Sequence, residues 1–87
     1  MKDLELKNII KIGDRDFLIS TIATKVRHTW FDEDDEKIVY ETMVFEMIDD
    51  EVQYHKPAFN ERFHTAEEAI AEHGAIIKNP DAFFIAK

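Results

Sequence analysis

Apolar and polar residues alternate with a period of two along three segments of the chain, which is typical of half-buried β-strands. The segments run over residues 4–12, 17–31 and 37–48. Each contributes a row of large apolar side chains to one side of the predicted sheet. In the second and third segments these rows are Leu18, Ile22, Val26 and Trp30, and Val39, Met43, Phe45 and Met47.

The predicted strands are joined in antiparallel order. Residues 13–16, Gly-Asp-Arg-Asp, form a turn signal between the first two segments and predict a β-hairpin. A register that pairs Trp30 with Val39 places Val26 opposite Met43 and gathers the large side chains on one face, whereas a shift by one residue would scatter them. We expect this face to be the core.

The periodicity changes to that of a helix after residue 64. Thr65 and Glu68 form a capping box, in which the threonine side chain accepts from a backbone N–H of the first turn. Pro80 disfavours the helical conformation at Asn79, so the helix is predicted over about 65–78. Its apolar stripe consists of Ala66, Ala69, Ile70, His73 and Ile77.

These elements predict a single α+β domain over residues 1–87. An antiparallel sheet of three to four strands, in the order β-β-β and then α, packs on one C-terminal helix. Residues 49–62 are less regular: Pro57 and Asn60 argue against a central strand, although Val52–His55 could extend an edge. The apolar tail at 83–85 should fold back onto the core or meet a partner.

Composition and charge narrow the classes of partner. The formal net charge is −8 and the basic residues are scattered, which disfavours direct nucleic-acid binding. No apolar run approaches the roughly 20 residues needed to cross a bilayer, and the charged N-terminus does not resemble a signal peptide. The chain has no cysteine, which excludes disulfides, thiol nucleophiles and thiolate metal sites. Together with the N-terminus, this agrees with a cytoplasmic protein, which we expect.

Motifs for catalysis or cofactor binding are weak. Four histidines lack metal-site spacing, Ser20 has no glycine elbow, and two glycines cannot make a phosphate loop. The acidic run 32–36 lacks the glycine of a calcium loop. We therefore predict no catalytic residue, no metal site and no cofactor. One polar pair stands out: the register places His28 opposite Glu41, either as a structural cross-strand pair or as a base and its orienter.

The third strand carries apolar residues on both faces, and one helix cannot cover both. Ile38, Tyr40, Val44 and Ile48, together with Phe83 and Phe84 of the tail, are therefore candidates for an interface with a protein partner or with a second copy of the chain. The alternative is that the tail and the 49–62 segment cover these residues within one chain.

Two segments carry a resemblance: residues 40–45, Tyr-Glu-Thr-Met-Val-Phe, and residues 61–69, which begin Glu-Arg-Phe-His-Thr, followed by His73. The chain resembles small phage and prophage proteins of Gram-positive bacteria over less than half its length. Those proteins often place glycine before the helix histidine, whereas here the order is His73-Gly74. The resemblance implies a phage-type accessory protein and brings no activity with it.

Three functions remain as hypotheses. The first is a non-enzymatic accessory protein that acts through protein contacts, as a candidate homodimer. The second is an acidic DNA mimic that inhibits a DNA-binding enzyme, suggested by the acids at 32–36 and 49–51. The third is a small enzyme that uses a metal or a His/carboxylate pair.

Overall fold

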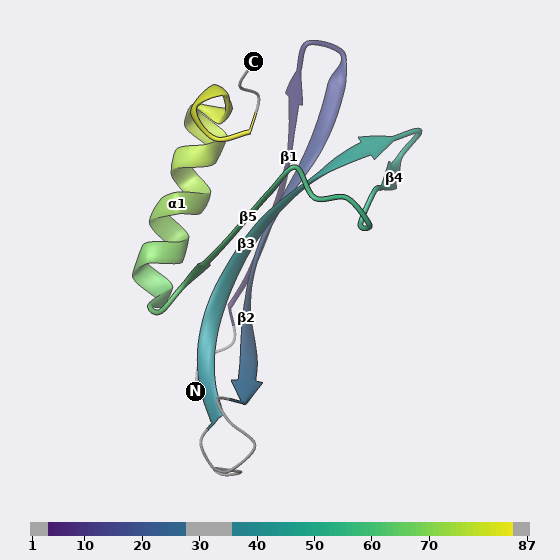
Figure 1. The fold of residues 1–87 in the computed structure, drawn as a ribbon. Coiled ribbons are helices and arrows are strands. Elements are labelled where there is room, and N and C mark those ends of the chain that lie inside the picture. The colour runs from purple at the N-terminus through teal and green to yellow at the C-terminus, as the bar shows by residue number, and fades with distance from the viewer. Residues whose placement is uncertain (1–3, 28–35, 85–87) are drawn as a thin grey trace.

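An antiparallel sheet with one helix lying across it makes up the fold (Figure 1). The computed structural model describes residues 4–27 and 36–84. It confirms the predicted α+β class. The elements in chain order are β1 (Glu5–Ile12), β2 (Arg15–Arg27), β3 (Glu36–Ile48), β4 (Glu51–Val52), β5 (Phe59–Phe63), α1 (Ala66–Lys78) and the 3-10 turn η1 (Pro80–Ala82).

The sheet has five strands. β1, β2 and β3 are neighbours in chain order, and β4 and β5 both pair with the far edge of β3. β4 pairs with the end of β3 at Met47 and Ile48, while β5 pairs with its middle, from Tyr40 to Val44. β5 was not predicted from the sequence. It begins after Pro57 and lies at the edge of the sheet, where the missing N–H of a nearby proline costs no ladder hydrogen bond.

Two tight turns fold the strands back on one another. Gly13 has φ 64° in the two-residue loop between β1 and β2, a conformation that glycine adopts without steric cost. Asp49 and Asp50, with φ 54° and 67°, form the loop between β3 and β4. Two successive positive φ values are typical of a type I′ turn, and aspartate tolerates them better than most residues.

The predicted register between β2 and β3 is wrong. Val39 pairs with Thr24, six positions before Trp30, and Met43 pairs with Ser20. Trp30 lies outside the described residues. Because the shift is an even number of residues, the two apolar rows still share one face, as predicted. The observed register places Ile19 opposite Val44, so the apolar contents of the other face also match.

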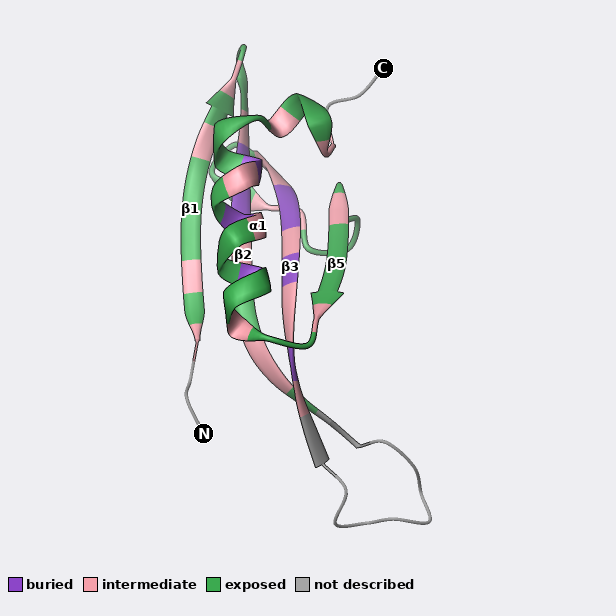
Figure 2. Ribbon diagram, turned by 90° about the vertical axis from the view of Figure 1, so that its left-hand side faces the viewer, coloured by how far each residue is buried: buried purple, intermediate pink, exposed green. Residues whose placement is uncertain are grey.

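The predicted core face is also wrong, because α1 covers the opposite side of the sheet. We call the covered side the helix face and the other side the open face (Figure 2). The buried centre on the helix face is formed by Phe17, Ile19, Val44 and Ile76. The rows that contain Leu18 and Met43 lie on the open face, where Leu18, Val39 and Phe45 are nevertheless buried. Both faces are apolar, and the helix packs on the one where the helix histidine finds polar partners.

The helix begins and ends as predicted, but it is rotated. Thr65 is the N-cap, and its side chain accepts from the Glu68 N–H at 3.1 Å. Ile76 is fully buried, whereas Ile77 is 36% exposed and Ile70 is 47% exposed. The buried stripe is therefore Ala69, His73 and Ile76. No helix among the described residues is long and apolar enough to cross a membrane.

The tail folds back onto the core. The Phe84 ring meets Phe17 edge to face with centroids 4.9 Å apart, and Phe83 meets Phe59 in the same manner at 5.8 Å. Such pairs contribute about 0.5–1.5 kcal/mol beyond the area they bury. Ile85 lies outside the described residues. The described part of the tail thus covers one end of the helix face within the chain.

The rotation of α1 predicts unequal effects at two neighbouring isoleucines. Ile76→Ala should lower the free energy of unfolding by about 2–5 kcal/mol, because it leaves a cavity in a packed core. Ile77→Ala, its matched control, should cost less than about 1 kcal/mol since its side chain is partly in water. Urea unfolding measures both, and equal losses would contradict the observed rotation.

Candidate functional site

The most organised group of polar side chains lies between α1 and the sheet. His73 projects from the helix onto the helix face and is 4% exposed. Its Nδ1 lies 2.7 Å from the Thr21 hydroxyl of β2, and its Nε2 lies 2.7 Å from the Asn8 side-chain oxygen of β1. The Thr21 hydroxyl lies 2.8 Å from that of Thr42 on β3. One helix and three strands meet in this chain of hydrogen bonds.

Hydrogen-bonding capacity fixes the direction of the chain. The Asn8 oxygen can only accept, so His73 Nε2 carries the proton and donates to it. Neutral His73 then has an acceptor at Nδ1, to which the Thr21 hydroxyl donates. The Thr21 oxygen in turn accepts from the Thr42 hydroxyl. Every buried side-chain polar atom among the described residues has a partner.

The chain of hydrogen bonds favours the neutral form of the His73 imidazole. Burial lowers the pKa of His73 below its ordinary value of 6.5, because the protein interior penalises the charged form. A second proton at Nδ1 would also face the Thr21 hydroxyl and require it to turn away. The group is enclosed and satisfied, which suits a structural role that positions α1 better than a role in proton transfer to a substrate.

The β2–β3 register places Glu41 differently from the prediction. Glu41 lies opposite Ile22 on β2, and His28 lies outside the described residues. On its other side Glu41 pairs with Arg62 of β5, with Nε and Oε2 3.8 Å apart. A pair at this distance with an exposed arginine contributes little to stability.

The candidate interface residues divide into three environments. Val44 is fully buried beneath α1 and is part of the core, so it presents no free surface. Ile38 and Tyr40 are half-buried on the same face, and Ile48 is 52% exposed at the end of β3. Phe83 and Phe84 pack on the core. These residues therefore do not form one exposed patch.

Sequence reasoning missed Asn8, Thr21 and Thr42. Its one available signal was His73, a polar residue in the middle of a buried helical stripe. A buried histidine requires partners on the facing sheet. Threonines at the same height on adjacent strands could supply them, and Thr21 is directly opposite Thr42.

Two further charged groups lie on the helix face. Arg15 and Glu46 form a bidentate pair with N–O distances of 2.9 and 3.0 Å, and this hydrogen bonding lowers the pKa of Glu46. The pKa of Glu72 on α1 is raised by burial and by its hydrogen bond with Glu61 of β5. The second contact places the Glu72 side of the helix toward β5.

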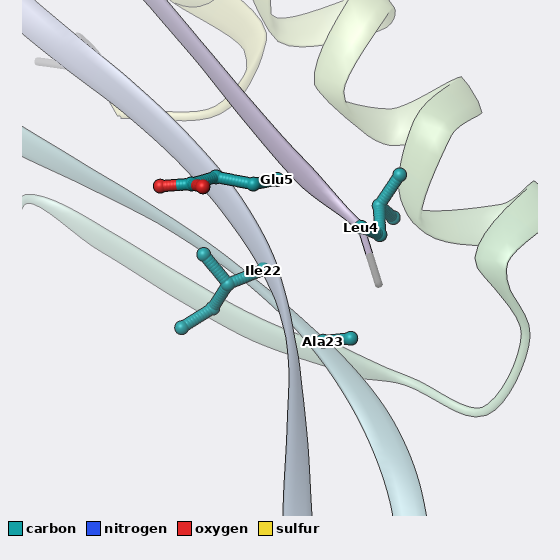
Figure 3. A pocket seen from close by; sticks show the side chains of 4 residues that line it. All are labelled: Leu4, Glu5, Ile22 and Ala23. Carbon is teal, nitrogen blue, oxygen red and sulfur yellow. The ribbon is translucent and has the colours of Figure 1, made fainter. Parts of the chain in front are cut away.

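A hollow of about 340 Å³ lies at the start of β1, lined by Leu4, Glu5, Ile22 and Ala23 (Figure 3). Glu5 and Ile22 point away from α1, whereas Leu4 points toward it. Glu5 is also paired with Lys7 at 3.2 Å. One exposed carboxylate among apolar side chains offers no convergent polar groups for catalysis.

Within residues 4–27 and 36–84, no three histidine, aspartate or glutamate side chains converge as a metal site would require. The described residues therefore contain a buried chain of hydrogen bonds at the α1–sheet contact, with exposed protein surface around it. Comparison with protein-family models, curated proteins and solved structures finds no match to this chain. Its function has to be argued from its own geometry.

Thr21 lies in the middle of the hydrogen-bonded chain and Thr42 at its end, so the two hydroxyls should contribute unequally to stability. Thr21→Val should lower the free energy of unfolding by about 1–3 kcal/mol, because it removes a partner from both His73 and Thr42. Thr42→Val removes only the terminal donor and should cost about half as much. Thermal or urea unfolding measures both, and a larger loss for Thr42→Val would contradict the central position of Thr21.

Stability should also depend on pH through His73. As the pH falls below 6.5, the unfolded chain takes up a proton that the folded chain resists, because the folded pKa is lowered. The free energy of unfolding therefore falls with pH from 6.5 down to the folded pKa and is unaffected by His73 above that window. His73→Gln, which can still accept from Thr21 and donate to Asn8, should flatten this slope. An unchanged slope would show that His73 is not its source.

Proposed function

We propose that this chain is a non-enzymatic accessory protein that binds a protein partner through the open face of its sheet. The observation that carries the proposal is that α1 covers one face only, while the other face also carries large apolar side chains. A cytoplasmic, phage-type protein of a Gram-positive bacterium, as the resemblance implies, fits this role.

The open face has an apolar centre and a charged rim, which is the usual anatomy of a protein interface. Leu18 and Phe45 lie side by side in its centre and are only 8% and 6% exposed, and the Tyr54 ring, which stands against Phe45 with centroids 5.0 Å apart, carries the apolar surface outward. Tyr54 is 65% exposed and Ile22 is 36% exposed. The rim carries the ion pairs Lys11–Asp16, Glu5–Lys7 and Arg62–Glu41.

The alternatives have less support. A DNA mimic needs carboxylates in an unneutralised row. Most of the acidic run 32–36 lies outside the described residues, and Glu5, Asp16, Glu41 and Glu46 each lie beside a basic side chain. An enzyme of the His/carboxylate type needs an accessible pair, and the buried histidine contacts hydroxyl and amide groups instead. Neither alternative is supported by a specific contact among the described residues.

Substitutions on the open face test the proposal. Ile22→Lys places a cation between Glu5 and Glu41 on the neighbouring strands, so the fold should survive while the apolar surface is broken. Tyr54→Lys removes the most exposed aromatic ring on that side. Both should abolish co-purification of the partner from a Gram-positive host, as identified by mass spectrometry.

The matched control is Ile48→Lys, which introduces the same charge at an exposed isoleucine on the helix side of the sheet. It should retain the proteins that the unsubstituted chain retains. If Ile22→Lys and Tyr54→Lys retain them equally well, or if the unsubstituted chain retains none, the proposed function is wrong.

A further inference from the structure

The outer edge of β1 is a second surface, distinct from the open face. No described strand pairs with that edge, and most of β1 is exposed along its length (Figure 2). An unpaired edge of eight residues presents a row of backbone donors and acceptors that can template another strand. Such an edge is normally short, covered or protected by charge.

The backbone ladder shows which groups point outward. The Ala23 N–H donates to the Leu4 carbonyl at 3.0 Å, which makes these two residues a hydrogen-bonded pair in the β1–β2 ladder. Because such pairs alternate in antiparallel sheets, the even residues of β1 bond inward to β2. The odd residues, Glu5, Lys7, Ile9 and Lys11, direct their N–H and C=O groups outward.

The charges on these odd residues suit a second copy of the same strand. When two β1 strands pair antiparallel about Asn8, Glu5 lies opposite Lys11 twice and Lys7 lies opposite Ile9 twice. Moving the register by two residues in one direction places Lys7 opposite Lys7, and in the other direction places it opposite Lys11. Like charges directly opposite are destabilising. One register is therefore favoured, and it also uses the strand from Glu5 to Lys11.

The flank of α1 that faces β1 adds apolar surface. Glu72 marks the β5 side of the helix, and at 100° per residue Ile70 and Ile77 lie on the opposite flank, toward β1. Both are partly exposed, and Leu6 and Ile10, on the helix face of β1, are half-buried. This strip continues the β1 edge on the helix side of the sheet.

We propose that two copies of this chain associate through β1, in the register centred on Asn8, to form one continuous sheet. The exposed strips of Ile70 and Ile77 face each other across the groove above the paired strands. This dimer uses the edge of the sheet and leaves the apolar centre of the open face free, although the side chains of Glu5, Lys7 and Lys11 also belong to the charged rim of that face.

A charge swap tests the register. Sedimentation equilibrium of the full chain should show a monomer–dimer equilibrium. Glu5→Lys or Lys11→Glu alone should raise the dissociation constant at least about tenfold, because two-fold symmetry doubles each change. The double variant restores opposite charges in the pair and should return to within about threefold of the unsubstituted chain. Thermal unfolding of dilute samples verifies that each variant is folded.

Single cysteines provide a second test, since the chain has none of its own. Asn8→Cys should form an intermolecular disulfide under mild oxidation, because residue 8 meets its own copy at the two-fold axis. This variant also removes the acceptor of the His73 Nε2–H, so thermal unfolding must first show that it is folded. Lys7→Cys, the matched control, meets Ile9 instead and should crosslink poorly. Tyr54→Lys, which lies beyond β3 and away from β1, should dimerise normally even if it loses the partner protein.

A monomer at millimolar concentration would overturn this proposal, as would a dimer that is insensitive to both charge reversals. Preferential crosslinking of Lys7→Cys would also contradict the register. None of these outcomes decides whether the open face binds a partner, because that test measures co-purification of a different protein.

Discussion

The hydrogen-bonded chain from Thr42 through Thr21 and His73 to Asn8 determines how α1 lies on the sheet. Apolar packing alone would allow the helix to roll, because isoleucines flank the histidine on both sides. A buried imidazole without partners costs about 1–3 kcal/mol, and the two threonines would add to that cost. Only the rotation that directs His73 onto the strands satisfies all these groups. The burial of Ile76 and the exposure of Ile77 follow from it.

Local signals in the sequence predicted the elements well and their assembly less well. The Thr65 cap, the stop before Pro80 and the alternation in β2 and β3 depend on neighbouring residues, and the structure agrees with each. The helix-covered face was mispredicted because both faces of β2 and β3 are apolar. Thr21 and Thr42 carry no signal of their own in the sequence, and a histidine far away in sequence makes them suitable for a core.

Register and edge strands are decided by long-range pairing. Alternation with a period of two cannot distinguish registers that differ by an even number of residues, so matching Trp30 with Val39 fitted as well as the observed pairing. β5 has a polar middle and forms because β3 offers a free edge beside it. The candidate site depended on the same long-range information, since only His73 could be singled out from its position in the helix.

A single helix on a five-stranded sheet leaves surface available for binding. A helix about 10 Å wide spans roughly two strands at 4.8 Å spacing, so the outer edge of β1 and part of the opposite face remain uncovered. The edge and the open face require different partners, one an extended strand and the other an apolar surface. Pairing two β1 strands about an axis perpendicular to the sheet keeps both open faces on the same side. A dimeric or repetitive partner would then meet two binding faces at once, and its affinity would gain from the high effective concentration of the second.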